Sequence, residues 1–560
     1  MRGAARRGGS GPGLDGRRPG GGGSPGDGGH GAEGDRAGPG DQRDQPGAAR
    51  AGAERGTERR ARKITPRLAM EVDLARALAP APAPAVLRKL AQRPREADPG
   101  YDPPAASSLS DAGSFLQAGP SLRLLAALFG DISAAPLPGV MPCLPAPGTA
   151  AAEKAAVRMR PVERPGGPWR DGRWHGLRVL AKDGTIRQVA DPKGADRMGA
   201  GGQSRNAAHF GRPASTGADA APQTRMVEVV NVWYRSAVAW AAGPCTIGET
   251  TLAAHLEPAY GPGDLDLADR GFPSRRAIAG KMKEGKHFAR RVSSAWNLRR
   301  CGRPLPDGTW KAKITWQGRT FKVRVIEYHM DQVFDLPADH PLVASPPPGP
   351  SVRVLGRDGD GDGGMCRQPD GTIRVEVSET VTVITDLMDV TAYPARDIAG
   401  LYGMRWVSEL VYLEEKQTLS AGQPVTAATP AGAYRMAAAT VAVHQALRIA
   451  GAAIAAAIGA EPARISATAL LGCVTASIGA GQGSAITALG SAIGILRRDI
   501  TRHPLRLVTA WRPGRCFPRF TIKKVRTRKS KGPVPSASRL HLLPLPAATA
   551  PADANAPPAA

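Results

Sequence analysis

The sequence has 560 residues, enough for about two to four domains of ordinary size, so length does not limit the burial of hydrophobic cores. Lys and Arg number 75 against 49 Asp and Glu, which gives a formal net charge of +26 at pH 7. An excess of this size favours polyanionic partners, because each phosphate that a basic side chain neutralises releases condensed counterions. The composition therefore indicates nucleic acid as the first partner to test.

Six cysteines are scattered through the chain without a C-x-x-C pair. This spacing argues against a zinc ribbon and against a dense disulfide framework, and it predicts isolated reduced thiols. The N-terminus is basic and no apolar segment follows it, so we expect no secretory signal and a cytoplasmic protein.

The chain begins with two segments of different character. Eighteen of the first fifty residues are Gly, and no periodic apolar pattern occurs before about residue 64. Residues 1–63 are therefore predicted to form a disordered Gly/Arg-rich extension. From that point the spacing of Leu, Met and Val predicts a small helical N-terminal domain over residues 64–150.

Residues 172–300 alternate strand and helix patterns, which predicts the first part of an α/β domain. The strand patterns are "GLRVLAKDGT", "TRMVEVVNVWY", "SAVAWAAGP", "GDLDLADRGF" and "HFARRVS", and helical spacing occurs in "GETTLAAHLEP" and "SRRAIAGKMKEG". Residues 301–392 contain mostly β-type text, as in "WKAKITWQGRTFKVRVIEYHM", and predict a β-rich insertion. The run "DGDGDGG" in this insertion has EF-hand spacing, but Pro369 occupies the position that needs Glu, so a turn is favoured.

Helical text returns over residues 393–500, the second part of the α/β domain, with one helix predicted at 394–419 and Ala-rich helices after it. The uncharged stretch from Ile465 to Leu496 is interrupted by Gly, Ser, Thr and Gln, so we expect a buried or loosely packed helical region in preference to a membrane span. Residues 501–533 form a basic segment with interleaved aromatic residues, and residues 534–560 are predicted to be a disordered tail.

Four polar residues share one stripe of the predicted helix. Tyr402, Arg405, Glu409 and Lys416 in "LYGMRWVSELVYLEEK" fall within about one sixth of the helix circumference at 3.6 residues per turn. A solvated helix face is the alternative interpretation. Glu414 lies on another side of the helix, and we expect its replacement by Ala to have little effect.

Two aspartates continue the apolar faces of their predicted strands. Asp183 follows Val179 and Ala181 in the alternation, and Asp269 follows Leu267. A carboxylate beside a core needs a compensating partner, although each Asp alone is well explained as a turn residue. Together with Glu409, the two aspartates have the composition of a site for two Mg²⁺ or Mn²⁺ ions, which activate and stabilise oxygens in phosphodiester chemistry.

The segments "AKDGT", "NAAHFGRP", "ADRGF" and "LYGMRWVSELVYLEEK" resemble the successive motifs of bacterial insertion-sequence DDE transposases of the IS-four type, over roughly residues 64–530. The stripe residues fit that family's Y-x2-R-x3-E-x6-K signature at every spacing. The resemblance implies an RNase H-like catalytic core interrupted by a β-rich insertion, with a small helical N-terminal domain and a helical C-terminal region.

The resemblance also implies two sets of site residues. The catalytic and metal-binding triad would be Asp183, Asp269 and Glu409, and the DNA contacts would be Tyr402, Arg405 and Lys416 beside the cleaved end and Lys523, Lys524 and Arg526 in the basic segment.

The sequence therefore predicts a metal-dependent DNA transposase. It would bind the terminal inverted repeats of its own element, cleave them and join the freed 3′-hydroxyl to target DNA. The implied partners are double-stranded DNA and a second copy of the chain, with no membrane, in a bacterial cytoplasm and at the nucleoid when bound. A catalytically inactive DNA-binding remnant is the alternative, because the net charge of +26 alone favours salt-dependent binding.

Overall fold

The structure of the protein is a computed structural model. It describes residues 66–78, 167, 169–191, 204–213, 220–344, 352–354, 370–479 and 537–543. The chain divides into two units, Met1–Gln45 and Pro46–Ala560, and every described residue belongs to the second unit. The predicted N-terminal extension, the basic segment 501–533 and most of the predicted helical domain 64–150 lie outside the described residues.

A mixed sheet organises the described residues. Its first five strands are β3 (Arg178–Gln188), β4 (Gln223–Asn231), β5 (Ser236–Pro244), β6 (Asp264–Ala268) and β7 (His287–Val292). β3, β4 and β5 are antiparallel neighbours, whereas β6 lies parallel to β3 and β7 parallel to β6. All five strands were predicted from their alternating sequence patterns, and the α/β fold class is confirmed at this level.

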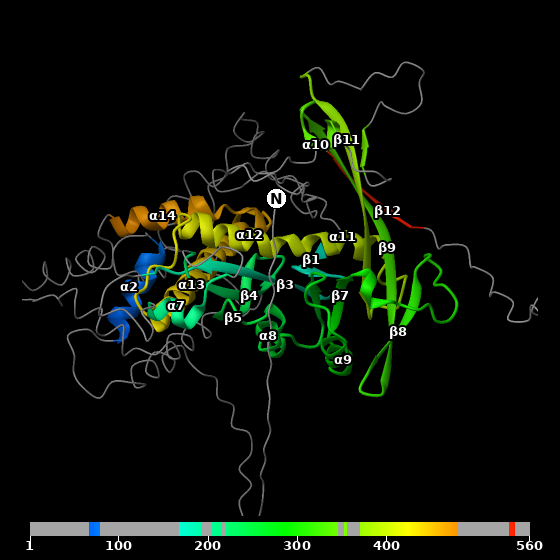
Figure 1. Cartoon of the computed structure of the whole chain (residues 1–560), viewed down its shortest axis with the longest axis horizontal. Coiled ribbons are helices and arrows are strands. Elements are labelled where there is room, and N and C mark those ends of the chain that lie inside the picture. The colour runs from blue at the N-terminus through cyan, green and yellow to red at the C-terminus, as the bar shows by residue number, and fades with distance from the viewer. Residues whose placement is uncertain are drawn as a thin grey trace, which may run out of the picture. The chain divides into compact units, whose positions relative to one another are not determined.

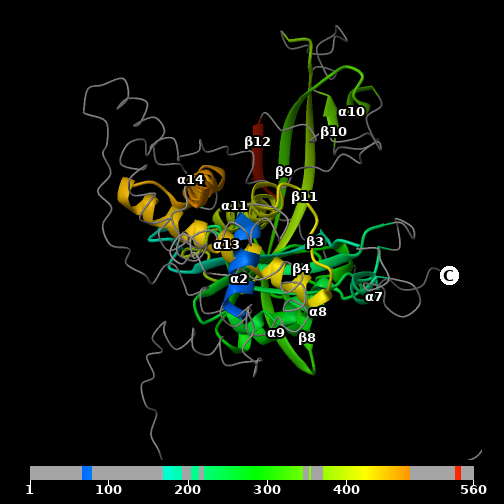
Figure 2. The same ribbon diagram turned by 90° about the vertical axis from the view of Figure 1, so that its left-hand side faces the viewer.

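The strands of residues 301–392 continue the same sheet. They are β8 (Trp310–Trp316), β9 (Arg319–Leu336), β10 (Val352–Val354) and β11 (Ile373–Thr385). β11 pairs with β7 on one side and with the long β9 on the other, so the β-rich text extends the sheet sideways from β7. Figure 2 shows β9 and β11 rising together away from β3 and β4.

A further strand comes from the C-terminal segment. β12 (Ala537–Leu542) pairs antiparallel with β9 and gives the sheet the order β12–β9–β11–β7–β6–β3–β4–β5. This strand lies inside the segment that the sequence predicted to be a disordered tail. The backbone of β9 explains the difference, because an unpaired strand edge offers a row of hydrogen-bonding groups to any nearby extended segment.

A small hairpin precedes β3. Its strands are β1 (Trp169–Arg170) and β2 (Arg173–Trp174), and the turn residues Asp171 and Gly172 both have positive φ, 48° and 76°. An Asp-Gly pair in this conformation forms the tight hairpin turn whose twist matches that of the strands. The hairpin delivers the Trp174 side chain, which is fully buried, to the main core.

Helices cover both faces of the sheet (Figure 1). Those described are α2 (Pro66–Leu78), α7 (Arg205–Phe210), α8 (Glu249–Ala254), α9 (Arg275–Lys283), α10 (Pro341–Ala344), α11 (Ala395–Gly403), α12 (Val407–Leu413), α13 (Pro430–Ile458) and α14 (Ala467–Gly479). α11 and α12 pack on one face of β3 and β6, and α8 packs on the other, so two hydrophobic clusters share the central strands.

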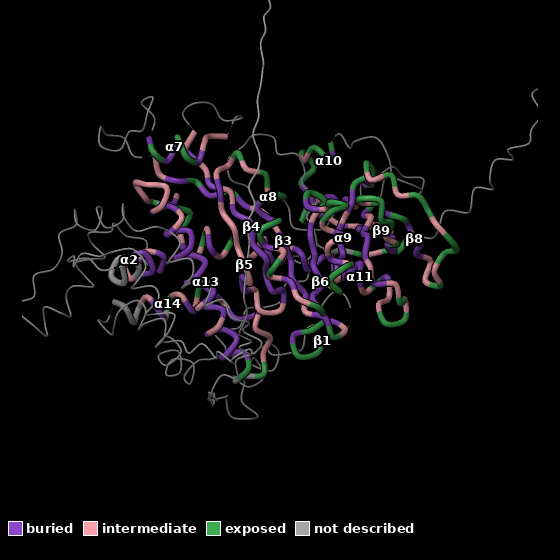
Figure 3. The backbone as a smooth tube through the Cα atoms, turned by 90° about the horizontal axis from the view of Figure 1, so that it is seen from below, coloured by how far each residue is buried: buried purple, intermediate pink, exposed green. Residues whose placement is uncertain are grey.

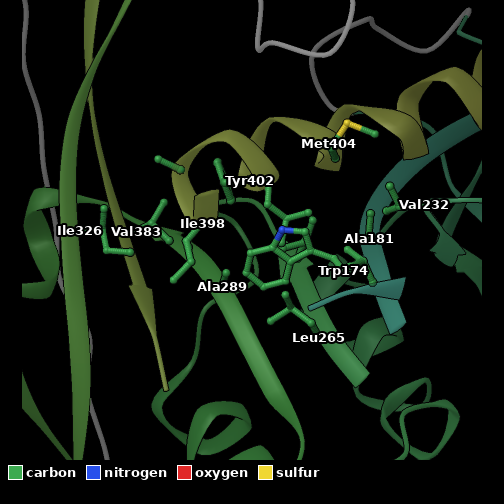
Figure 4. Packing of buried hydrophobic residues seen from close by; sticks show 14 of the residues in the cluster. Trp174, Ala181, Val232, Leu265, Ala289, Ile326, Val383, Ile398, Tyr402 and Met404 are labelled. Atoms are coloured by element: carbon green, nitrogen blue, oxygen red, sulfur yellow. The ribbon is translucent and has the colours of Figure 1, made fainter. Parts of the chain in front are cut away.

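The larger cluster surrounds Trp174. Val179 and Ala181 of β3, and Leu265 and Leu267 of β6, meet the buried side of α11 and α12 here. Figure 4 shows the Trp174 ring between these strands and the helical segment that carries Tyr402 and Met404. Figure 3 shows buried residues concentrated along the central strands and α13. Packing in this cluster positions α11 and α12 against β3 and β6.

The helix predicted at 394–419 is present from Ala395 to Leu419, but it changes pitch twice. Between α11 and α12 lies the 3₁₀ turn η6 (Met404–Trp406), and α12 is followed by the π-helical turn η7 (Glu414–Leu419). A 3₁₀ turn rotates the chain faster than an α-helix and a π turn more slowly. Positions beyond Met404 therefore deviate from the regular spacing used to define the stripe.

The long helix α13 is the part of the described chain that meets the length and hydropathy of a membrane span, over Pro430–Ala456 with a mean hydropathy of 1.3. Of that window 89% is buried inside the protein. Ala437 and Val441 pack on Met226 of β4 and Ala237 of β5. Burial of this kind is typical of a core helix, and α14 gives the uncharged text after Ile465 a helical structure up to Gly479.

Candidate functional site

Asp183 and Asp269 occupy neighbouring positions where β6 ends. The parallel register pairs Lys182 of β3 with Ala268, the last residue of β6. Asp269 follows that pair on one strand, and Asp183 follows it on the other. β3 itself continues to Gln188, so Asp183 lies within a strand and not at its end, which differs from the sequence expectation.

Both carboxylates also make local backbone contacts. Asp269 Oδ1 accepts a hydrogen bond from the backbone N–H of Arg270 at 2.7 Å, and its carbonyl oxygen accepts one from Phe272 at 3.0 Å. Asp183 Oδ1 accepts from the N–H of Gly184 at 2.8 Å. The turn interpretation is therefore correct for Asp269, and it leaves the second carboxylate oxygen of each residue for other partners.

Arg405 links two of the three predicted carboxylates. It lies in the 3₁₀ turn η6 and is 8% exposed. Its Nη1 donates to Asp183 Oδ2 at 2.9 Å, and its Nη2 lies 3.7 Å from Glu409 Oε1. The Arg405–Glu409 pair spans one helical turn, whereas the Arg405–Asp183 pair joins the helix to the sheet.

Tyr402 reaches the second aspartate. Its hydroxyl lies 3.5 Å from Asp269 Oδ1 and 3.5 Å from the carbonyl oxygen of Ala268, and its ring is 3% exposed within the Trp174 cluster. Burial raises the pKa of the phenol well above its usual value, so Tyr402 stays protonated and is able to donate. Tyr402 and Arg405 are thus buried against the two aspartates, and the solvated-face interpretation is wrong for these two members of the stripe.

Lys416 contacts the same strand further along. It lies in the π turn η7, and its Nζ donates to Thr185 Oγ1, two residues after Asp183. Burial and the nearby charge of Arg187 lower the pKa of the amine, against the opposing effect of Glu415 and Glu228. Three of the four signature residues, Tyr402, Arg405 and Lys416, therefore contact β3 or the end of β6.

Two residues that the sequence analysis did not select also belong to this site. The Tyr412 hydroxyl donates to the carbonyl oxygen of Asp183 at 2.6 Å and accepts from the N–H of Glu228 at 3.2 Å. Arg291 on β7 pairs with Glu379, and the negative charges of that partner and of Asp269 raise its pKa against the opposing effect of burial. A basic pair in the strand text "HFARRV" was the available signal for Arg291.

The electrostatics of the site centre on Asp183. Burial raises its pKa, and the nearby charges of Asp269 and Glu249 raise it further. The Arg405 guanidinium and the Gly184 N–H act in the opposite direction. Carboxylates that repel one another while partly buried are stabilised by a bound cation, and in this structure Arg405 supplies that charge.

The donor chemistry fits the divalent metal that the sequence implies, because carboxylate oxygens are the ligands that Mg²⁺ and Mn²⁺ prefer. The three carboxylates do not converge. Within the described part of the chain, no three Asp, Glu, His or Cys side chains lie close enough together to hold one ion. Glu409 is 38% exposed and is oriented toward Arg405. The geometry is that of an acidic site occupied by an arginine.

The remaining predicted DNA contacts, Lys523, Lys524 and Arg526, lie outside the described residues. They stay predictions.

Comparison with models of known protein families gives no match, and neither does comparison with curated proteins. Among solved structures, the chain is similar to a piggyBac transposase synaptic complex with hairpin DNA, with 8% sequence identity and a TM-score of 0.27. The match covers 58% of this chain and 54% of that chain, so it spans about half the length of the solved protein. Similarity at this level does not establish a common fold.

Proposed function

We propose that the protein is a DNA transposase of the DDE type, with Asp183, Asp269 and Glu409 as its catalytic carboxylates. The observation that carries the proposal is the position of the signature helix. Arg405 and Tyr402, three residues apart, reach Asp183 and Asp269 on two different strands. Because these residues were selected from their spacing in the sequence alone, their meeting at one place in the fold supports a shared role.

The strand arrangement supports the same proposal. Three antiparallel strands, β3, β4 and β5, are followed by two strands parallel to β3, with helices on both faces. This topology is compatible with an RNase H-like core. Asp183 lies on the central strand β3, and Asp269 lies directly after the parallel strand β6. Both carboxylates therefore lie at the same end of β6, where a substrate would bind in the proposal.

The proposed chemistry assigns a role to each side chain. In the proposal Asp183 and Asp269 would hold Mg²⁺ or Mn²⁺, and Glu409 would complete the site only after its side chain turns away from Arg405. The ion would supply an activated oxygen nucleophile and stabilise the leaving oxygen. In the proposal Arg405 would contact a backbone phosphate with its forked guanidinium, and Lys416 would act as a point charge. Tyr402 holds Asp269 by its hydroxyl. The substrate would be double-stranded DNA, namely terminal repeats and target DNA, held by a homodimer.

The proposal is tested with Asp269→Asn, which keeps the shape of the side chain and removes its charge. The probe is a duplex made from the DNA that flanks the reading frame, incubated with the full chain and Mg²⁺ or Mn²⁺. We expect the unmodified protein to cleave it and Asp269→Asn to cleave about a hundredfold or more slowly, with binding kept. Asp339→Asn, an exposed carboxylate in a turn, is the control and should cleave normally.

The alternative function, a DNA-binding remnant without catalysis, gives a different result in the same assay. The folded, unmodified protein would then bind the duplex and cut nothing with either metal. Equal cleavage by Asp269→Asn and Asp339→Asn would instead exclude the proposed triad.

A further inference from the structure

A second cluster of charged residues lies on the opposite face of the sheet. Side chains alternate along a strand, so Lys182 projects away from its neighbour Asp183, toward the side covered by α8 and α9. Asp266 of β6 and Arg290 of β7 share this face with Lys182 in the strand register. The side chains of all three are buried: Lys182 is 2% exposed, and Asp266 and Arg290 are 0% exposed.

Two residues from outside the strands complete the cluster. Glu257, in the 3₁₀ turn η4 (Glu257–Ala259), lies 2.8 Å from Lys182 Nζ and 2.9 Å from the Nζ of Lys281 on α9. Lys281 Nζ also lies 3.1 Å from Asp266 Oδ2, which pairs with Arg290 as well. Three buried cations thus share two carboxylates. One positive charge is left without a counter-charge inside the cluster.

Arg290 itself is incompletely paired. Its Nη2 donates to Asp266, but its Nε and Nη1 are buried and have no hydrogen-bond partner among the described residues. An unpaired N–H of a buried guanidinium costs several kcal/mol in solvation, so such a group is usually compensated by an anion or a polar partner. Burial likewise lowers the pKa of Lys182.

A cavity of about 930 Å³ opens onto this cluster between α8, α9 and the sheet. Lys182, Lys281 and Arg290 form part of its lining, and two exposed residues of α9, Arg276 and Lys283, add further positive charge. Glu257 and Glu284 are the acidic residues of the lining. Five cations line the cavity against Glu257, Glu284 and the adjoining Asp266, which leaves an excess of two positive charges.

We propose that this cavity binds a phosphate monoester group, either of a small molecule or at the 5′ end of a nucleic-acid strand. A compact dianion with several acceptor oxygens matches cations that approach from different elements. The lysines and the arginine at the base of the cavity are buried, so the phosphodiester of an intact duplex cannot approach them. The site faces away from the proposed catalytic carboxylates and does not depend on them.

The test is calorimetric titration of the full chain with inorganic phosphate at constant ionic strength. The variant Arg276→Gln/Lys283→Gln removes the two exposed charges of the cavity, and Arg275→Gln/Lys313→Gln removes two exposed charges outside it. We expect saturable binding by the unmodified chain. We also expect about tenfold weaker binding by the cavity variant, because charge-assisted hydrogen bonds are lost, and no change in the control variant.

Competition distinguishes the two sources of the phosphate group. A short single strand with a 5′-phosphate that displaces inorganic phosphate, where the 5′-hydroxyl strand does not, identifies a nucleic-acid end. Displacement by nucleoside monophosphates but not by the strand identifies a small molecule.

Two results would overturn the proposal. One is the absence of saturable binding at phosphate concentrations up to about 10 mM, where a specific site would be occupied. The other is equal affinity in the cavity and control variants.

Discussion

Arg405 connects sequence and function at the scale of single residues. It comes from a predicted helix whose charged residues, taken alone, favoured a solvated face, and the structure buries it between Asp183 and Glu409. The Arg405 guanidinium contacts two carboxylates in a partly dehydrated site and supplies the positive charge that they need. The arginine therefore stabilises the acidic site in the structure, and the proposed function would give it a second role, contact with the DNA backbone.

The stabilising contact of Arg405 with Asp183 predicts how the variant Arg405→Ala behaves. Loss of the guanidinium leaves Asp183 buried without its cation, so we expect a loss of about 2 to 3 kcal/mol in the free energy of unfolding. Divalent metal should restore part of this loss, because a bound cation takes over the charge. Thermal or urea unfolding with and without about 10 mM Mg²⁺ measures both effects. Arg396→Ala, exposed on α11, is the control and should respond to neither change. A variant stabilised by Mg²⁺ no more than the control would contradict the account.

At the scale of elements, α12 is followed by the π turn η7, whose charged residues contact the neighbouring elements. A π turn inserts an extra residue into the helical repeat, and such turns occur often at functional sites. Here the turn carries Glu414, Glu415 and Lys416, and both glutamates face the interior. Regular helical spacing places Glu414 and Glu415 outside the stripe that holds Arg405 and Lys416. The sequence expectation that Glu414 is dispensable does not agree with its contacts.

Glu414 accepts hydrogen bonds from His444 and Arg448 of α13 and is 15% exposed. Glu414→Ala leaves Arg448 buried without its partner, so we expect a loss of about 3 to 5 kcal/mol in unfolding free energy. Urea denaturation measures this loss. Leu413→Ala, at the neighbouring position with a side chain that is 49% exposed, should cost far less. Equal midpoints for the two variants would show that the ion pair contributes nothing.

The same contacts predict a dependence of stability on pH. Burial acts to raise the pKa of Glu414, but Arg448 and His444 lower it more strongly. The pKa of Glu414 therefore lies well below the usual value for a glutamate. A depressed carboxylate pKa contributes stability that is fully present above the unfolded pKa of about 4.3 and is lost as pH falls below it. Unfolding free energy measured from pH 6 down to pH 3 should therefore fall more steeply for the unmodified protein than for Glu414→Gln. Parallel curves would contradict the assignment.

At the scale of the whole molecule, the excess of positive charge predicts that binding to duplex DNA depends strongly on salt concentration. The chain carries +26, and the proposed partner is a polyanion. If about six to ten phosphates are contacted, affinity for duplex DNA should fall by about 10³ to 10⁵ between 50 and 200 mM salt, because released counterions must be recovered on dissociation. Equilibrium binding across that range tests this expectation. Affinity that changes less than tenfold would argue against a phosphate-dominated interface.

Much of the secondary structure could be predicted from the sequence. The text "GLRVLAKDGT" and "GDLDLADRGF" alternates polar and apolar residues, and this period defines a strand whatever its neighbours are. Strands β3 to β7, helices α8 and α9, the β-rich character of residues 301–392 and the helix that starts at Ala395 followed from such local periods. The spacing of Tyr402, Arg405, Glu409 and Lys416 was also local information, and it selected the helix that meets the two aspartates.

Only the tertiary structure decided which side chains meet. The pairing of Lys182 with Ala268 places Asp183 beside Asp269, and strand register is a property of two distant segments that no local pattern contains. The contacts of Tyr412 with the carbonyl of Asp183 and of Arg405 with its carboxylate depend on the same register. The buried charge cluster around Arg290 was likewise invisible in the sequence, because alternation shows that a residue faces inward but not which partners it finds there.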